Sequence, residues 1–523
     1  MNSSVMPHEF VTSEKITIDY LNYADSIKQV FPKHFKKPTI RKLSMDRQEI
    51  TDKLLDYNHR INASEQVIEN IESLSQPETY VVITGQQPGI FSGPLYTVYK
   101  AISAIVLCER LSNRKHSFIP VFWNASEDHD LSEVNHITIF KQNKPFKIQY
   151  DCESTDVAYS HLHLDKIQLK KILAMIRNVS PNSEFKEPLL NEINRIIQVS
   201  SNIGDFFSRF MIHLFGDLGL VLIEPQQLRE LMTPVFEKLI RKPTECTRIL
   251  TETNLQLDKL GYSPKIHKKP DLCNFFILND KGERSRVKYD GKFRVANETF
   301  SQKELLRLLN DNPFRFSANA VTRPVTQDFL FPTFAYVAGP NEIAYYAQLK
   351  EIYPFFSVDM PVIFPRFGAT IIEKKTSKVL RKYKAKIYEF KDPEKLLKKL
   401  AKENIADVFN SVKNEVSKSM DRVTEEAVSI DKNLIGSCSL AKGKMLKTVE
   451  VLEDKITSEL KKQDLIARRQ IIKVYNNVFP YGDLQERQIN VLEYLMKFGE
   501  KFLEIVHEDF FEAEYGEHRV IRC

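Results

Sequence analysis

The chain has 523 residues, too many for a single core, so about two or three domains are expected. Its 42% hydrophobic and 28% charged residues are typical of a globular protein. A formal net charge of +6 over this length is too small to argue for binding to nucleic acid. No stretch has the roughly 20 apolar residues that a membrane helix needs, so no membrane association is expected.

Cysteine usage and the first residues bear on the compartment. The six cysteines are scattered, with no Cys-x-x-Cys pair, which argues against a zinc ribbon and against a secreted disulfide framework. The chain begins without the basic segment and apolar core of a secretory signal. These features predict a reducing, cytoplasmic location.

The first strong pattern follows an amphipathic helical segment at residues 1–79. Tyr80–Thr84 is a β-branched run that stops at Gly85, which predicts a buried strand. An amphipathic helix is expected to begin at Pro94, and Phe118–Trp123 is the next strand. The crossover of such a strand–helix–strand unit is almost always right-handed, with the strands parallel.

The loops after these two strands are expected to face one another, because ligands bind where parallel strands end. The glycine-rich loop would hold an anion on bare N–H groups at a helix N-terminus, although a plain connection remains an alternative. It is neither a Walker A loop nor a dinucleotide-binding turn. The candidate nucleotide- or anion-binding residues are Gly85, Gln86, Gln87, Gly89, Gly93, Tyr96, Lys100 and, after a later strand, Gly339.

The second loop is acidic and contains an imidazole. Its candidate catalytic residues are Glu127, Asp128, His129 and Asp130. His129 is the best candidate for a general base, oriented by a neighbouring carboxylate. These side chains crowd onto one short segment, whereas metal ligands usually converge from several, so no metal is predicted and a capping loop is the remaining alternative.

The same order of elements recurs later in the chain. Residues 136–151 read as a hairpin, Gly219–Pro225 as a third strand, and Thr333–Ala338 as a strand followed by Gly339-Pro340 and a helix. An isolated arginine is usually in a surface ion pair, but arginines flanking the predicted sheet edge also suit carboxylate recognition. The candidate substrate-binding residues are Trp123, His136, Arg323, Gln327, Asp328, Glu342, Tyr345 and Arg366.

The last third of the chain changes character. Apolar residues step by three and four through two long segments, which predicts a helical hairpin with a coiled-coil seam, broken near Gly436-Ser437 or Gly443. Such an arm favours dimerisation. The expected segments are an N-terminal helical segment (1–79), a Rossmann-type core in two parts (80–249 and 311–372), a small antiparallel insertion (250–310), a coiled-coil arm (373–478) and a C-terminal helical segment (479–523).

Six motifs together resemble one family. In chain order they are TGQQPGIFSGPLYTVYKA, PVFWNASEDHDLSEVNH, TRPVTQDFLFP, YVAGPNEIAYYAQL, the Pro365-Arg366 pair and LQERQIN. They are similar to motifs of the bacillithiol biosynthesis cysteine-adding enzymes, the BshC family. The resemblance implies an α/β Rossmann-type core like that of class I aminoacyl-tRNA synthetases, with connecting-peptide insertions and a homodimer formed through the C-terminal coiled coil. The implied activity is the addition of cysteine to glucosaminyl-malate.

Amide formation requires an activated carboxyl and a free amine. ATP is the candidate activator, and it would convert the carboxyl into an adenylate or an acyl phosphate. The candidate bound nucleotide is ATP or ADP. Under this hypothesis the Gly85–Pro94 loop takes a phosphate or another anion, Asp128 and His129 hold or deprotonate the amine, and Arg323 and Arg366 take the malate carboxylates. Two rivals remain: another adenylate- or amide-forming enzyme on this scaffold, and an inactive nucleotide-binding coiled-coil scaffold.

Overall fold

The computed structural model describes residues 4–40, 46–128, 130–151 and 157–523. The chain divides into two units. Unit 1 comprises Met1–Thr370 and Gln485–Ile521, and unit 2 comprises Ile371–Leu484 and Arg522–Cys523. The C-terminal helices therefore fold with unit 1, although the long helices of unit 2 separate them in sequence from the rest of it.

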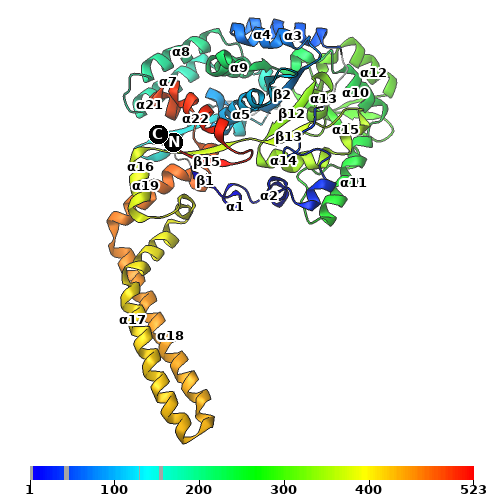
Figure 1. Ribbon diagram of the computed structural model, residues 1–523. Coiled ribbons are helices and arrows are strands. Elements are labelled where there is room, and N and C mark those ends of the chain that lie inside the picture. Colours follow the sequence, from blue (N-terminus) through cyan, green and yellow to red (C-terminus); the bar gives the residue numbers. More distant parts are fainter. Residues whose placement is uncertain (1–3, 41–45, 129, 152–156) are drawn as a thin grey trace. The chain divides into compact units, whose positions relative to one another are not determined.

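Unit 1 is built on a five-stranded parallel sheet (Figure 1). Its spatial order is β13 (Val362–Pro365), β12 (Thr333–Ala338), β2 (Thr79–Gln86), β3 (Ser117–Asn124) and β6 (Val221–Ile223). All four neighbouring pairs are parallel. Numbered along the chain within this sheet, the order is 3-2-1-4-5, that of a Rossmann fold, so the predicted fold class is confirmed.

Helices cover both faces of this sheet (Figure 1). Strands β3, β6, β12 and β13 are buried along almost their whole length, as expected of strands covered on two sides. The main helices in contact with the sheet are α3 (Gln48–Arg60), α5 (Leu95–Leu111), α9 (Ile203–Phe215) and α14 (Pro340–Tyr346). Helix α5 joins β2 to β3 and packs on both, which is the strand–helix–strand unit that the sequence predicts.

Two antiparallel elements are inserted in the sequence between strands of the parallel sheet. The predicted hairpin is confirmed as β4 (His136–Lys141) and β5 (Lys144–Gln149). A five-stranded insertion has the order β10 (Glu298–Phe300), β9 (Phe293–Val295), β8 (Arg284–Tyr289), β7 (Leu272–Leu278) and β11 (Phe316–Ala318). The helices α10 (Thr233–Arg241), α11 (Glu245–Lys259) and α12 (Gln302–Asp311) accompany it.

The two ends of the chain meet in unit 1. Strand β1 (Ser4–Met6) pairs antiparallel with β15 (His518–Arg522). The other terminal helices are α1 (His8–Val11), α2 (Lys15–Asn22), α4 (Glu65–Ser73), α20 (Gln485–Gln488), α21 (Leu492–Phe498) and α22 (Lys501–Glu512). The remaining elements of unit 1 are α6 (Leu131–Val134), α7 (Lys166–Val179), α8 (Lys186–Val199), α13 (Arg323–Leu330), α15 (Ile352–Phe355) and the short helix η3 (Tyr159–His161). Strand β14 (Gly368–Ile372) crosses from unit 1 into unit 2.

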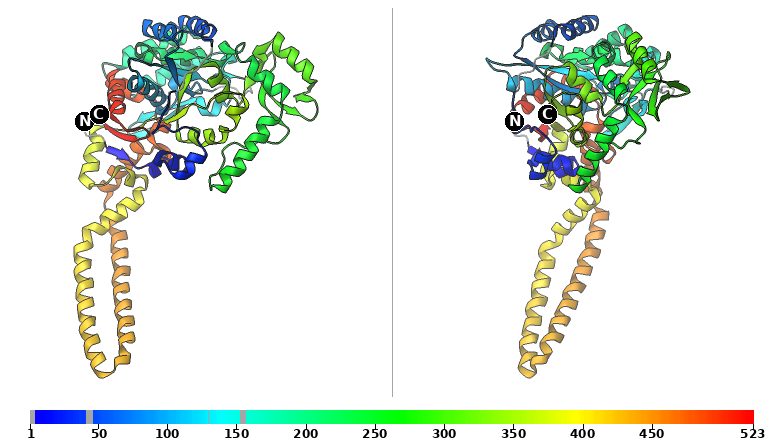
Figure 2. Two further views of the ribbon diagram at one scale, coloured as in Figure 1. Left: turned by 45° about the vertical axis from the view of Figure 1, so that its right-hand side comes forward. Right: turned by 90° about the vertical axis from the view of Figure 1, so that its right-hand side faces the viewer.

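Unit 2 contains a long helical hairpin (Figure 2). Helix α17 (Pro393–Ile430) and helix α18 (Ile435–Gln463) run side by side, joined by the short helix η9 (Lys432–Leu434) and accompanied by α16 (Lys374–Tyr383) and α19 (Leu465–Val478). The turn therefore precedes both predicted breakpoints, Gly436-Ser437 and Gly443. The Asp431 side chain accepts a hydrogen bond from the Asn433 amide and starts the turn there, while both glycines lie within α18.

Two further observations concern the whole described chain. None of its helices is both long and apolar enough to cross a membrane. Five of the six cysteines lie in it as free thiols, and Cys152 lies outside the described residues.

Candidate functional site

A cavity of about 700 Å³ opens where the strand order of the parallel sheet reverses, at the carboxyl ends of β2, β3 and β12. Ligands of open α/β sheets bind at such a switch point. The predicted site residues that line it are Gly85, Gln86, Gln87, Tyr96, Lys100, Trp123, Glu127, Asp128, Arg323, Gly339, Glu342, Tyr345 and Arg366. All belong to unit 1.

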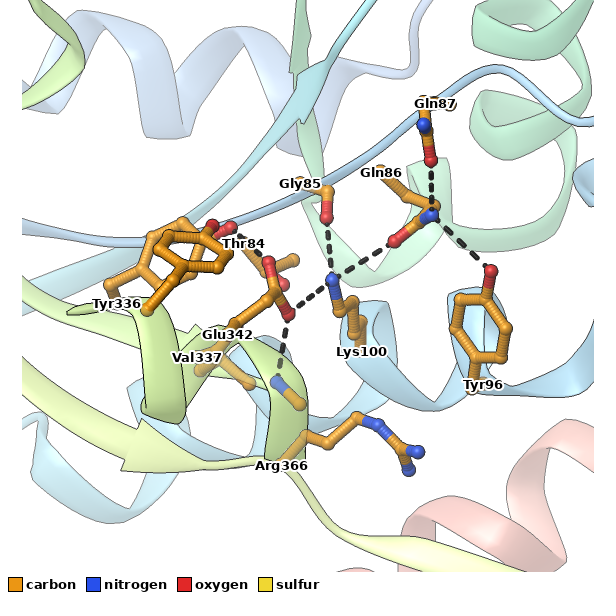
Figure 3. Close-up of polar contacts among 12 residues, drawn as sticks. Thr84, Gly85, Gln86, Gln87, Tyr96, Lys100, Tyr336, Val337, Glu342 and Arg366 are labelled. Atoms are coloured by element: carbon orange, nitrogen blue, oxygen red, sulfur yellow. Dashed lines mark hydrogen bonds and ion pairs between the residues drawn. The ribbon is translucent and has the colours of Figure 1, made fainter. Parts of the chain in front are cut away.

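A buried ion pair joins the two halves of the sheet at this point (Figure 3). Lys100 lies about one and a half turns into α5, and its side chain reaches back to the end of β2. Its Nζ lies 2.5 Å from Glu342 Oε2 on α14 and donates to the Gly85 carbonyl at 2.8 Å and to Gln86 Oε1 at 3.0 Å. Lys100 thus ties the β2 end of the switch point to the β12 end.

Glu342 is held from its own side as well. Its carboxylate accepts the Gly339 N–H at 2.8 Å and the Tyr336 hydroxyl at 2.7 Å (Figure 3). Burial raises the pKa of Glu342, but the nearby Lys100 ammonium and these hydrogen bonds outweigh it and hold that pKa below its usual value. Burial lowers the pKa of Lys100, with Glu342 opposing the change.

The loops after β2 and β3 meet at the cavity, as expected from the sequence. Gln87 Nε2 donates to Asp128 Oδ2 at 3.0 Å and to Glu133 Oε2 at 2.6 Å. Burial raises the pKa of Glu133, the Gln87 hydrogen bond lowers it, and Asp130 and Asp128 raise it further. Two carboxylates therefore share one amide nitrogen at the cavity wall.

The rest of the acidic run has different surroundings. Glu127 accepts hydrogen bonds from Arg229 Nε at 2.7 Å and from the Ser317 hydroxyl at 2.8 Å. Asp130 is not among the described residues that line the cavity, and the predicted general base His129 lies outside the described residues. Within the described part of the chain, no three His, Cys, Asp or Glu side chains are placed to hold a metal ion.

The turn before α5 is closed, contrary to the expectation of an anion site there. Gly89 and Gly93 are buried and are not among the described cavity residues. The Leu95 N–H donates to the Ile489 carbonyl at 2.8 Å, and Asn490 Nδ2 donates to the Gly93 carbonyl at 2.6 Å. The N–H groups of Gly93, Leu95 and Thr97 already donate to the carbonyls of Ile90, Ile489 and Pro94. Because these donors are used and the turn is buried, the N-terminus of α5 is not open to a phosphate.

The two predicted carboxylate-binding arginines differ. Arg366 already forms a two-pronged ion pair with Glu486 of the LQERQIN motif, at 2.5 and 3.0 Å. Arg323 Nη2 donates to the Tyr345 hydroxyl at 2.8 Å, and no described carboxylate forms an ion pair with Arg323. Arg323 is therefore better placed than Arg366 to receive a ligand carboxylate.

Three predicted substrate-binding residues are not among the described cavity residues. Gln327 and Asp328 are buried in α13, where Asp328 accepts a hydrogen bond from the Tyr353 hydroxyl at 2.6 Å. Burial raises the pKa of Asp328 to about 6. His136 begins β4 and is not among the described residues that line the cavity. The TRPVTQD motif thus contributes Arg323 to the cavity while its Gln and Asp pack inside.

Several cavity residues escaped the sequence reasoning. Lys268, Phe276 and Arg284 come from the antiparallel insertion and its approach, and Asn319 follows β11. Arg284 Nη1 lies 3.6 Å from Asp128 Oδ1. No local pattern marks these residues, because only the folding of the insertion over the sheet edge brings them to the site. Tyr336 also lines the cavity. The predicted strand Thr333–Ala338 contains it, so its place near the carboxyl end of that strand was a signal in the sequence.

Comparisons with known proteins agree along the chain. Residues 2–367 match the model described as "Bacillithiol biosynthesis BshC, N-terminal Rossmann-like domain", and residues 369–523 match "Bacillithiol biosynthesis BshC, C-terminal coiled-coil domain". A relative in Salinibacter ruber named "Putative cysteine ligase BshC" is 31% identical over 512 residues, covering 93% of this chain and 92% of the relative. One of the same name in Bacillus cereus (strain G9842) is 29% identical over 531 residues, covering 98% of each.

One solved structure aligns along most of this chain. A Campylobacter jejuni protein titled "putative arginyl t-RNA synthetase" aligns over 88% of this chain and 97% of its own, at 10% identity and a TM-score of 0.24. That score is too low to support an argument about fold or function. The family models carry the assignment, and by their match over both units this chain belongs to the BshC family of bacillithiol biosynthesis.

Proposed function

We propose that the chain is a ligase that joins L-cysteine to the amine of glucosaminyl-malate through an amide bond, the last step of bacillithiol biosynthesis. The observation that carries the proposal is the switch-point cavity. It holds a carboxylate pair and a cation, Arg323, that forms no ion pair with a carboxylate of the described residues. The names of the relatives support the cysteine half of the reaction.

The carboxylate pair suits the amine. Asp128 and Glu133 would hold the protonated amine of glucosaminyl-malate by charge-assisted hydrogen bonds. The amine must lose a proton before its nitrogen can attack the carboxyl carbon of cysteine, and His129, adjacent in sequence, stays the candidate base. As the C–N bond forms, a carboxyl C–O bond breaks, and the departing oxygen leaves with its activating group.

The cations suit the malate. Arg323 and Lys268 line the cavity, and neither forms an ion pair with a described carboxylate. The fork of Arg323 would take one malate carboxylate and Lys268 the other. Arg366, already paired with Glu486, would support this wall of the cavity rather than bind the ligand directly.

Activation of the cysteine carboxyl needs an energy source, for which ATP is our candidate. The N-terminus of α5 does not fit a phosphate, because its turn is buried and the Leu95 N–H already donates to the Ile489 carbonyl. We therefore assign no step to a nucleotide at Gly89 or Gly93.

The coiled-coil arm is our candidate for a homodimer interface. Apolar side chains of the predicted seam stay open to solvent, including Val423 and Leu452, each 52% exposed. A second copy of this chain would cover them. Light scattering should give twice the mass of 60.8 kDa, and a monomer at micromolar concentration would contradict this part of the proposal.

The ligase activity can be tested directly. Purified protein is incubated with cysteine, glucosaminyl-malate and ATP, and the ligated thiol is sought by mass spectrometry. N-acetylglucosaminyl-malate, whose amine is blocked, is the matched control and should give no product. In parallel, the gene is deleted from a bacillithiol-producing cell, which should lose the thiol, accumulate glucosaminyl-malate, and recover on re-expression. Absence of product in vitro together with unchanged thiol in the deletion strain would overturn the proposal.

A further inference from the structure

A chain of hydrogen bonds runs from the buried ion pair to the carboxylate pair. Figure 3 shows its first part, from Lys100 through Gln86 to Gln87. Lys100 Nζ donates to Gln86 Oε1 at 3.0 Å, and Gln86 Nε2 donates to Gln87 Oε1 at 2.8 Å. Gln87 Nε2 then donates to Asp128 and Glu133. We call Lys100, Gln86 and Gln87 the relay.

The chemistry of the groups fixes the direction of the relay. An ammonium can only donate, so the amide oxygen of Gln86 must face Lys100 and its NH₂ group must face away. The Gln87 oxygen accepts from that NH₂ group, so the NH₂ group of Gln87 points at the two carboxylates. An ionised carboxylate can only accept. Every hydrogen bond of the relay is therefore donated in the same direction, from Lys100 toward Asp128 and Glu133. The lysine fixes this direction at one end, and the carboxylates accept the last hydrogen bonds at the other.

We propose that Lys100 is a positioning residue for the amine subsite: by directing the Gln86 and Gln87 amides, it holds the carboxylates of Asp128 and Glu133 in the geometry that receives a primary amine. This inference rests on the proposed function and names the part of the site that recognises the amine of glucosaminyl-malate. Lys100 acts through the glutamines, since its own Nζ is bound to Glu342 and to the end of β2.

The relay also affects ionisation at the subsite. The groups acting on Glu133 are Asp128 and Asp130 from its own loop and Gln87 from the end of β2. Tyr96 of α5 and Tyr159 of η3 also interact electrostatically with Glu133. A hydrogen bond donated by Gln87 favours the charged carboxylate, so losing it raises the pKa of Glu133 and moves the acidic limb of activity to higher pH.

The sharpest variant is Gln86→Glu, which keeps the size of the side chain and an acceptor for Lys100 but cannot donate onward. The Gln87 amide then turns its NH₂ group toward the new carboxylate and its oxygen toward Asp128 and Glu133. We expect KM for glucosaminyl-malate to rise about tenfold or more, the loss of a hydrogen bond to a charged group, while KM for cysteine changes by less than about twofold. The acidic limb of kcat/KM should move to higher pH.

Two further variants protect the test against misfolding. Lys100→Met alone leaves Glu342 buried without its cation, so the double variant Lys100→Met/Glu342→Gln removes both charges and should show the same rise in KM. Glu109→Gln, on the exposed side of α5, is the matched control and should leave both KM values unchanged. If Gln86→Glu and the double variant both match this control in KM and pH profile, Lys100 does not position the subsite.

A second readout does not depend on turnover. In protein labelled with ¹⁵N-glutamine, the side-chain NH₂ signals of Gln87 are identified by their loss in Gln87→Leu. In the wild type they should shift as the two carboxylates are protonated, and in Lys100→Met/Glu342→Gln, which adds no new carboxylate beside Gln87, that shift should shrink to less than half. A wild type that shows the shift yet neither binds nor converts glucosaminyl-malate would refute the proposed function. A Lys100→Met/Glu342→Gln variant that keeps the full shift would refute the relay.

Discussion

Two turns of the same sequence type, Gly93-Pro94 and Gly339-Pro340, lie in different environments: Gly93 of the first is buried away from the cavity, and the second lines the cavity. Each follows a buried strand of the parallel sheet and precedes a helix. The first is sealed by Ile489 and Asn490, which take its backbone groups. The second opens on the cavity, where Glu342 caps α14 and pairs with Lys100. The local sequence sets the turn, and a segment about 400 residues away decides whether that turn is a site.

The largest loss of stability should come from a change in the C-terminal segment, Glu486–Asn490, that seals the first turn. Glu486 is fully buried and pairs with Arg366, so Glu486→Ala leaves a buried guanidinium without its carboxylate. We expect unit 1 to lose about 3–5 kcal/mol of unfolding free energy. The single tryptophan, Trp123 in β3, reports denaturant unfolding of this unit by fluorescence.

Glu109→Gln again serves as the control, because its ion pair with His507 is partly exposed. A loss below about 1 kcal/mol in Glu486→Ala, as for an exposed pair, would contradict the role given to the C-terminal segment.

The next effect depends on pH and concerns His518, which packs beside the same pair. Its Nε2 lies 2.8 Å from the Thr370 hydroxyl, and burial lowers its pKa to about 4. Between about pH 6.5 and pH 4 this histidine is protonated in the unfolded chain, where its pKa is about 6.5, but stays neutral in the folded chain. The free energy of unfolding therefore decreases as pH falls from about 6.5 to about 4. The loss attributable to His518 reaches about 3 kcal/mol at the acidic end.

His518→Asn should remove this part of the acid sensitivity. Urea midpoints at pH 7 and pH 5 should therefore differ less in His518→Asn than in the wild type. An equal pH dependence in both proteins would show that His518 is not held neutral by the fold.

The smallest effect compares the two turns themselves. Gly93 has φ +69°, a conformation that side chains rarely adopt, so Gly93→Ala should destabilise unit 1 by about 1–3 kcal/mol. Gly339 has φ −76°, and an added Cβ would meet Glu342 and Arg366 at 3.4 and 3.6 Å, which is ordinary contact. Gly339→Ala should change stability by less than about 0.5 kcal/mol. Equal losses in thermal unfolding of the two variants would remove the distinction.

Sequence patterns predicted much of the fold because strands and crossovers are local. The β-branched run Tyr80–Thr84 placed β2, the apolar run Thr333–Ala338 placed β12, and the rule for parallel strands brought Gln87 and Asp128 together. What they could not predict depends on partners distant in the chain. The sequence around Gly93 does not indicate its contact with Asn490, and the sequence around Arg366 does not indicate its ion pair with Glu486. Lys268 reaches the cavity only through the folding of the insertion.

The hairpin turn in unit 2 illustrates a second limit. Glycines were the natural breakpoints, yet the capping side chain of Asp431 decided the turn, because an exposed glycine within a helix is only mildly unfavourable.

Hydrogen exchange with bound glucosaminyl-malate tests the central claim, that the reaction site is the open switch point and not the sealed turn. We expect added protection in peptides that cover residues 85–87, 127–133 and 339–345. Peptides around Gly93 and Leu95 should exchange as slowly without the ligand as with it. Protection that appears at Gly89–Leu95 or in the arm instead, with none at 339–345, would contradict the account.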